Sequence, residues 1–260
     1  MKKIILILLC LPYILLSKEE RKYEKTISFS QFAKELKEAA DKGISYTLQN
    51  CYITYDPLND KQYVLYTSSK DPDKFYGDMI IKDLKFNDSS DVIIKNCKFG
   101  QRSKEWTTTV TFEDCSFGKL SVLYNDINSI NIKKVNAQIL NIKNLVSSEL
   151  KEKIFFNQGQ SSLDITIDSS KIWRSILQNY PNNDVTEDFA IVRLINNDIS
   201  FCEITSFEKG QIDVWKNKLG GLVIKSSMGF EDDRKINYVS IRKNVFKSGI
   251  TNIGQCILEH

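Results

Sequence analysis

The segment VRLINNDISFCEITSFEKGQIDVWKNKLGGLVIKSSMG, residues 192–229, decides the fold of this chain. Every fifth residue in it belongs to one set, six of whose eight members are aliphatic: Leu194, Ile199, Ile204, Lys209, Val214, Leu219, Ile224 and Gly229. A second set lies two residues before each of these and includes Val192, Cys202 and Leu222. A short, fixed period of this kind is typical of a solenoid.

The same period recurs between residues 110 and 147, in the set Phe112, Phe117, Val122, Ile127, Ile132, Ala137, Ile142 and Ser147. A helix repeats near 3.6 residues and a half-buried strand repeats at 2, so neither explains a period of five. Two inward positions that alternate as in a strand, followed by a corner, do explain it. The pattern therefore predicts an all-β solenoid, a right-handed parallel β-helix whose coils bury apolar residues against one another.

Two short motifs resemble the repeats of pentapeptide-repeat proteins. They are Asn96-Cys97-Lys98-Phe99 and Asp114-Cys115-Ser116-Phe117, in which a small residue precedes the inward aromatic residue by two. The resemblance covers roughly half of the chain and implies four-sided coils of about twenty residues. Larger residues such as Phe207 and Ile130 occupy the small position elsewhere, and a broader class of right-handed β-helix therefore remains open.

Charged residues twenty positions apart support this coil length. Four opposite-charge pairs have that offset: Glu113 with Lys133, Asp114 with Lys134, Arg193 with Asp213, and Asp198 with Lys218. Opposite charges on adjacent strands stabilise a sheet by about 0.2–1 kcal/mol per pair. Asn197 and Asn217 share the offset too, which predicts a stack of side-chain amides at a corner.

The N-terminus resembles an export signal. Lys2 and Lys3 precede an apolar run from Ile4 to Leu16, and the small residue Ser17 follows it. We expect residues 1–17 to form a signal peptide and the protein to be exported, as a secreted, periplasmic or cell-surface protein. A lipoprotein modified at Cys10 and an uncleaved anchor are the alternatives. No later segment is apolar for long enough to form a membrane-spanning helix.

The remaining chain divides into a cap and a solenoid. Residues 26–43 read as a helix that Ser28 caps, and we expect this region, residues 18–45, to cover the open first coil. Residues 46–260 would form the β-helix, with coils over 46–147 and 192–246, an irregular and partly helical insertion over 148–191, and a tail over 247–260. Within the insertion, short helices are expected over 149–156 and 171–180.

Composition and spacing exclude several classes of function. The chain has 36 basic and 33 acidic residues, which gives no argument for a nucleic-acid partner. It also lacks the strongly acidic surface with which some pentapeptide-repeat proteins imitate DNA. Four of the six cysteines (Cys51, Cys97, Cys115 and Cys202) occupy inward positions, where free buried thiols are expected. No cysteines have chelating spacing and the one histidine is His260, so neither a metal nor a cofactor is expected.

Candidate site residues are few. Asp164 and Asp168 are weak candidates for a catalytic carboxylate pair, because β-helix enzymes that cleave polysaccharides use carboxylates on an outer face. Trp215 follows the inward Val214 and should face solvent, whereas Trp106 and Trp173 are expected in insertions. Trp173 and Trp215 are the candidate binding residues, since an exposed tryptophan stacks on a sugar ring or anchors a protein partner.

These observations favour an exported, non-enzymatic β-helix that serves as a binding or structural surface scaffold, with a glycan or a protein as its partner. The alternative is a carbohydrate-active β-helix enzyme, a polysaccharide lyase or hydrolase. The two differ in one respect: an enzyme should bring several carboxylates or basic side chains into one groove, whereas a scaffold should present paired ladders only.

Overall fold

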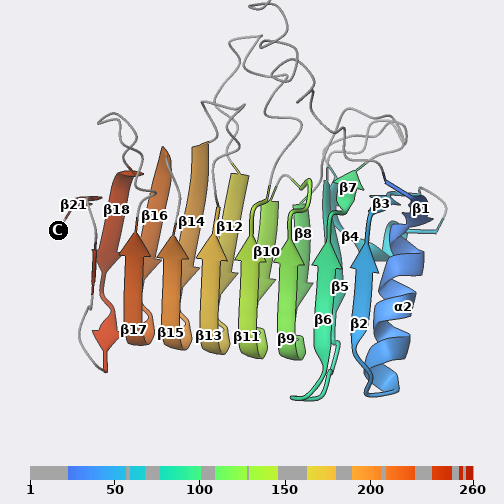
Figure 1. Ribbon diagram of the computed structural model, residues 1–260, viewed down its shortest axis with the longest axis horizontal. Coiled ribbons are helices and arrows are strands. Elements are labelled where there is room, and N and C mark those ends of the chain that lie inside the picture. Colours follow the sequence, from blue (N-terminus) through green and yellow to red (C-terminus); the bar gives the residue numbers. More distant parts are fainter. Residues whose placement is uncertain are drawn as a thin grey trace, which may run out of the picture.

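The computed structural model describes residues 23–56, 59–67, 77–100, 109–127, 129–145, 163–179, 189–205, 209–225, 236–247, 252–253 and 256–259. They form an elongated solenoid whose strands lie side by side along its long axis (Figure 1). Helix α2 lies at one end and the C-terminus near the other. Every strand pairing among these residues is parallel except that of β4 with β5. The expected parallel β-helix is confirmed.

Two large sheets form the body of the solenoid. The front sheet contains β2 (Tyr46–Gln49), β6 (Asp91–Lys95), β9 (Ser116–Leu123), β11 (Asn136–Lys143), β13 (Lys171–Gln178), β15 (Asp198–Thr205), β17 (Lys218–Lys225), β19 (Val245–Phe246) and β20 (Asn252–Ile253). The back sheet contains β4 (Val64–Thr67), β5 (Gly77–Lys82), β8 (Thr109–Glu113), β10 (Ser129–Lys133), β12 (Leu163–Asp168), β14 (Phe189–Ile195), β16 (Lys209–Trp215), β18 (Ile236–Arg242) and β21 (Cys256–Glu259). A small third sheet contains β1 (Lys25–Ser28), β3 (Cys51–Thr54) and β7 (Lys98–Gly100).

The shortest coils contain twenty residues, as the charge pairs predict. Ser129 pairs with Thr109 in the back sheet, and Lys218 pairs with Asp198 in the front sheet. Other coils are longer: 27 residues separate the partners Lys171 and Asp198, and 35 separate 136 from 171. The extra residues fall between the end of a front-sheet strand and the start of the next back-sheet strand, for example between 143 and 163. These insertions therefore enter the solenoid at one edge, whereas three extra residues between β5 and β6 enter it at the opposite edge.

Each coil has two long sides, and the expected four five-residue sides are wrong in this respect. In β11, Gln138 and Ile139 separate the buried Ala137 from the buried Leu140 without a turn. The strand continues through these two outward residues, which we call the double outward step. Neighbouring strands have the same step in register, at 173–174, 200–201 and 220–221, so the ladder stays aligned from coil to coil.

The corners between the back and front sheets depend on left-handed backbone. Lys134, Ser169, Asn196, Lys216 and Lys243 all have φ between 51° and 56°, a region that non-glycine residues rarely occupy. The residue after each corner turns inward. Asn197 Nδ2 donates to Asn217 Oδ1 over 3.0 Å, which confirms the expected amide stack.

The hydrogen bonds at the corners extend beyond that pair. We call the series of inward residues Ser170, Asn197, Asn217 and Asn244 the corner ladder. The Asn197 backbone N–H donates to Asn217 Oδ1 over 2.9 Å, and the Asn217 N–H donates to Asn244 Oδ1 over 2.8 Å. Ser170 continues the ladder on the other side, because its N–H donates to Asn197 Oδ1 over 2.9 Å. Buried backbone groups at successive corners are thus paired by side chains rather than by strands.

The core is a continuous column of inward residues between the two sheets. Ile132, Ile142, Val214 and Ile224 are fully buried there, as the five-residue period predicts. Cys51, Cys97, Cys115 and Cys202 are buried free thiols, which is also as expected. The first coil is covered by α2 (Phe29–Asp41), which begins at the expected Ser28 cap: the Gln31 N–H donates to Ser28 Oγ over 3.2 Å.

The cap packs through aromatic side chains. Phe29, Phe32 and Leu36 are buried on the inner face of α2. The rings of Phe32 and Phe99 meet edge to face, with their centroids 5.8 Å apart. This contact joins the helix to strand β7, so that the helix covers the apolar end of the solenoid as predicted.

Three sequence-based expectations fail or lie beyond what is described. The helix expected over 171–180 is wrong, because Lys171–Gln178 is strand β13. Together with β12 it makes a complete coil within the region expected to be an irregular insertion. The helix expected over 149–156 and the signal peptide over 1–17 lie outside the described residues.

Candidate functional site

Asp164 and Asp168 both lie on the outer side of β12, each half-buried. They are four residues apart on one extended strand, which places their Cα atoms about 13 Å apart. Retaining glycosidases hold their two carboxyl groups about 5–5.5 Å apart, and inverting ones about 6.5–9.5 Å apart. Arg193 on β14 pairs with Asp164, Nη1 to Oδ2 over 3.3 Å. The structure therefore gives no support to these two residues as a glycosidase pair.

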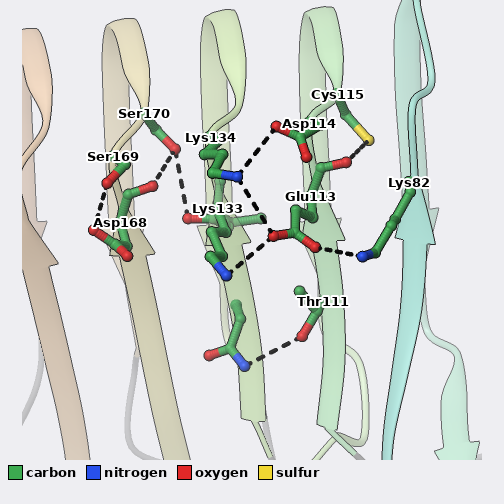
Figure 2. Close-up of polar contacts among 12 residues, drawn as sticks. Lys82, Thr111, Glu113, Asp114, Cys115, Lys133, Lys134, Asp168, Ser169 and Ser170 are labelled. Atoms are coloured by element: carbon green, nitrogen blue, oxygen red, sulfur yellow. Dashed lines mark hydrogen bonds and ion pairs between the residues drawn. The ribbon is translucent and has the colours of Figure 1, made fainter. Parts of the chain in front are cut away.

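Glu113, at the end of β8, is the centre of the most extensive charge network on the back sheet (Figure 2). Its Oε2 lies 2.8 Å from Lys82 Nζ on the preceding coil, and its Oε1 lies 3.0 Å from Lys133 Nζ on the following coil. Its side chain is only 9% exposed. Hydrogen bonds from Lys82 and then Lys133 hold the pKa of Glu113 at about 2.

Figure 2 also shows a further ion pair and several hydrogen bonds around this network. Lys134 lies 3.8 Å from Asp114, which is one of the pairs that the twenty-residue offset predicts. Ser169 Oγ donates to Asp168 Oδ1 over 2.9 Å. Opposite charges and hydrogen-bonding groups alternate from coil to coil, and this arrangement holds neighbouring strands together. It is a structural ladder, with each drawn carboxylate engaged by a neighbouring donor.

Trp173 is the most exposed large apolar side chain of the described residues, at 66%. It is not in an insertion, contrary to expectation, but in the middle of strand β13. The double outward step places Trp173 and Arg174 in succession on the outer side of the front sheet, and both are exposed. A tryptophan held this way stands on a hydrogen-bonded sheet, with a strand on either side of it.

The neighbouring strands complete a small surface around this tryptophan. The Arg174 guanidinium lies over the ring of Phe201 on β15, with Cζ 5.8 Å from the ring centroid. Beyond Phe201, strand β17 contributes Gly220 and Gly221 at the same level. A Cβ on Gly221 would lie 3.3 Å from the Phe201 ring, and one on Gly220 would lie 2.1 Å from the Ser200 carbonyl oxygen. We call Trp173, Arg174, Phe201, Gly220 and Gly221 the aromatic platform.

Trp215 lies on the outer side of the back sheet, at the end of β16, and is 39% exposed. Its solvent-facing position is as predicted from the inward Val214. Lys216 Nζ lies 4.3 Å from the centroid of its ring, so one face of the indole is occupied by a cation–π contact within the chain. Trp106 lies outside the described residues. Trp173 is therefore the stronger of the two candidates for stacking on a ligand.

A groove of about 600 Å³ runs beside the capping helix. Its lining mixes charges that are already paired on α2, such as Lys37 and Asp41 with Nζ and Oδ1 3.0 Å apart. The groove therefore offers a ligand no charge of one sign, and Tyr63, the aromatic residue in its lining, is half-buried against the core.

Sequence reasoning identified Trp173 but not the rest of the aromatic platform. Phe201 and the two glycines fall between inward positions, where the five-residue period assigns no role. The sequence feature that could have identified them is the pair of consecutive outward residues in each front-sheet repeat. Once these are aligned from coil to coil, 173–174, 200–201 and 220–221 lie side by side.

Among the residues that the structure describes, no three histidine, cysteine or acidic side chains are grouped so that they could hold a metal ion. No helix in this part of the chain is both long and apolar enough to cross a membrane. No protein-family model, no curated protein and no solved structure matches this chain. The resemblance to pentapeptide-repeat proteins accordingly stays a prediction.

Proposed function

We propose that this protein is an exported, non-enzymatic binding scaffold whose ligand contacts the front sheet at the aromatic platform. The observation that carries this proposal is the 66% exposure of Trp173 in the middle of a strand. A large apolar side chain in that position leaves most of its surface in water when no ligand is bound. Tryptophan is among the residues that contribute most to binding energy at interfaces.

The scaffold also supports binding energetically. Strand β13 is paired on both sides, with β11 and β15, so the backbone that carries Trp173 is held in place before a ligand arrives. Binding to a rigid surface avoids the entropy loss of ordering a loop, which costs about 0.5–1.5 kcal/mol for each flexible side chain that is immobilised. A sheet that presents an exposed aromatic ring on a rigid backbone is therefore suited to recognise a flat partner such as a sugar ring.

The alternative, a polysaccharide lyase or hydrolase, has less support. An enzyme of this kind needs carboxylates or basic groups that converge on one bond of the substrate. The carboxylates Asp164 and Asp168 are about 13 Å apart along their strand, and Glu113 is bound between two lysines. No observation on the described residues favours cleavage over binding.

The test is a glycan array with the purified protein, followed by titration of each retained glycan under tryptophan fluorescence. We expect Trp173→Ala to abolish binding and Trp215→Ala to leave it unchanged. Trp215→Ala is the matched control, because it also removes one exposed indole from an outer sheet face. A parallel assay for new reducing ends or unsaturated products measures cleavage. Catalytic release of reducing ends or of unsaturated products would contradict the binding proposal and support the polysaccharide hydrolase or lyase instead. Retention of full affinity by Trp173→Ala would exclude the platform.

A further inference from the structure

We propose that the aromatic platform binds an acidic polysaccharide, with a sugar ring on the face of Trp173 and the carboxylate or sulfate of the glycan at Arg174 and Lys171. This inference rests on the proposed binding function and deepens it by naming the ligand class. It is carried by the distribution of charge between the two faces of the solenoid, and by whether the cations on each face already form ion pairs with carboxylates.

The front sheet is basic. Its strands contain seven lysine and arginine residues (Lys95, Lys119, Lys143, Lys171, Arg174, Lys218 and Lys225) against three acidic residues (Asp91, Asp198 and Glu203). Back-sheet strands, counted over the residues whose side chains are described, contain four basic residues (Lys82, Lys133, Arg193 and Arg242) and five acidic ones (Asp78, Glu113, Asp164, Asp168 and Asp213). The whole chain carries only +3, so the positive charge is concentrated on the face that presents Trp173.

The two cations beside Trp173 also differ from most back-sheet cations in what they contact, although Lys119 elsewhere on the front sheet lies 3.1 Å from Asp91. On the back sheet, Lys82, Lys133 and Arg193 each lie within 3.3 Å of a carboxylate oxygen. On the front sheet, Lys171 and Arg174 form no ion pair with a carboxylate in the described part of the chain. Both are exposed and flank Trp173 on the same strand. Their charges are thus available to an anionic ligand without breaking an existing pair.

Arg174 is oriented by the contact with Phe201. Its guanidinium Cζ lies over that ring at 5.8 Å from the centroid, which is within cation–π distance. The N–H donors of a guanidinium bind a carboxylate or a sulfate in a bidentate manner. Gly220 and Gly221 place no side chain beyond Phe201. A chain of sugar rings that extends from Trp173 past Arg174 and Phe201 therefore meets no side chain at these two positions of β17.

A polysaccharide fits these features better than a nucleic acid does. Nucleic-acid-binding domains are typically more basic, with an isoelectric point above about 9, and the isoelectric point of this chain is about 8.4. A sugar ring needs one exposed aromatic face, and Trp173 supplies it. The N-terminal sequence, Lys2-Lys3 followed by the apolar run to Leu16, is typical of exported proteins, which encounter extracellular glycans.

The experiment compares polymers that share a backbone and differ in charge. Polygalacturonate and its fully methyl-esterified form are titrated against the full-length protein, together with alginate, chondroitin sulfate and poly(U). We expect at least one acidic glycan to bind ten-fold or more tightly than the esterified polymer and than poly(U). Affinity for that glycan should fall several-fold between 50 and 300 mM NaCl, because the contacts are ionic.

Matched variants locate the site. Trp173→Ala and Arg174→Gln should each weaken binding of the acidic glycan at least ten-fold, and Trp173→Phe should restore part of the affinity. Trp215→Ala and Arg242→Gln change the same residue types on the back sheet and should have no effect. Thermal unfolding of each variant confirms that it is folded, as is expected for substitutions of exposed side chains.

The outcomes separate the two proposals. Equal binding of the esterified and the charged polymer, lost in Trp173→Ala, would overturn the acidic-ligand inference and leave the binding scaffold intact. Tighter binding of poly(U) than of any glycan would overturn it in favour of a nucleic-acid ligand. Failure of all three acidic glycans to bind would also overturn it. If no glycan or protein partner responds to Trp173→Ala, the proposed function fails as well.

Discussion

At the scale of single residues, Glu113 shows how one carboxylate joins three coils. Lys82, Glu113 and Lys133 belong to β5, β8 and β10, which are successive strands of the back sheet. Exposed ion pairs contribute at most about 1 kcal/mol each. The carboxylate here is buried to 9% side-chain exposure and accepts from both lysines, and its removal leaves the two ammonium groups without their shared partner.

We expect Glu113→Gln to lower the free energy of unfolding by about 1 kcal/mol at pH 7. The folded protein depresses the pKa of Glu113 from 4.5 to about 2. The contribution is therefore fully present above pH 4.5 and is lost as the pH falls through 2. Urea unfolding of both proteins at pH 7 and at several values between 4.5 and 2 measures this. Glu203→Gln on the front sheet is the control. A difference between wild type and Glu113→Gln that is constant down to pH 2 would contradict the assignment.

The second prediction for single residues concerns the reactivity of the inward cysteines. Burial raises the pKa of the Cys97 and Cys202 thiols to about 12 and that of Cys115 to about 11. Little thiolate is present at neutral pH, and the reagent has no access. We expect Cys51, Cys97, Cys115 and Cys202 to react with iodoacetamide only after denaturation, as measured by peptide mapping with mass spectrometry. Rapid labelling of Cys97 or Cys115 in the native protein would contradict their inward position.

At the scale of elements, the side chains of the corner ladder supply hydrogen bonds to backbone groups that a neighbouring strand supplies elsewhere in the solenoid. The side chain of Asn217 accepts from the Asn197 backbone N–H over 2.9 Å and donates to the Leu194 carbonyl over 2.8 Å. Both backbone groups lie where the chain turns from one sheet to the other. Because these groups are buried, the free energy of folding depends on the amide that pairs them.

Asn217→Ala should therefore destabilise the protein by about 2–4 kcal/mol, since it leaves a buried donor and a buried acceptor without partners. Asn131→Ala is the matched control: its amide donates to a side chain, Thr111 Oγ1, over 3.3 Å, so no backbone group loses its partner. The expected cost of the control is below about 1 kcal/mol. Chemical denaturation of both variants tests the difference, and equal costs would show that the ladder is not a stabilising element.

The sequence predicted the inward positions because these are aliphatic and regularly spaced. It failed at β13 for a specific reason. In that strand the inward residues Ile172 and Ser175 are three positions apart. The apolar residues Trp173, Ile176 and Leu177 have the i, i+3, i+4 spacing of one helix face. The double outward step thus imitates helical spacing. The corners were not predictable in detail either, because Lys134 and Lys216 adopt φ values that favour glycine or asparagine.

Charge pairs predicted the register better than they predicted the contacts. Arg193 lies opposite Asp213 as expected, but its guanidinium is 3.3 Å from Asp164 on the other neighbouring strand. A long side chain on a solenoid reaches the coil before it as easily as the coil after it. The platform was predicted only at Trp173, because surface residues that meet across coils are 20 to 28 positions apart in the sequence.

At the scale of the whole molecule, the two sheets share one uninterrupted core from the cap to the last coils. Val214→Asp places a carboxylate in that core without a partner, which costs several kcal/mol. We expect the coils on both sides of β16 to lose protection in hydrogen exchange, while α2 and the first coils keep theirs, since each coil contacts only its neighbours. Lys225→Asp, at an exposed position of β17, is the control. Unchanged protection in Val214→Asp would contradict the solenoid register.

The different lengths of the coils have a mechanical consequence. A force that pulls the two ends apart acts on the coils in series, and each coil that detaches releases its own length of chain. Coils of 20 residues release about 70 Å, and coils of 27 and 35 residues about 95 Å and 120 Å. Stretching a single molecule from its C-terminal end should therefore give a sawtooth trace in which steps for the register offsets 27, 20, 27 and 35 follow one another. The length of each step in the trace would then identify the coil that detaches.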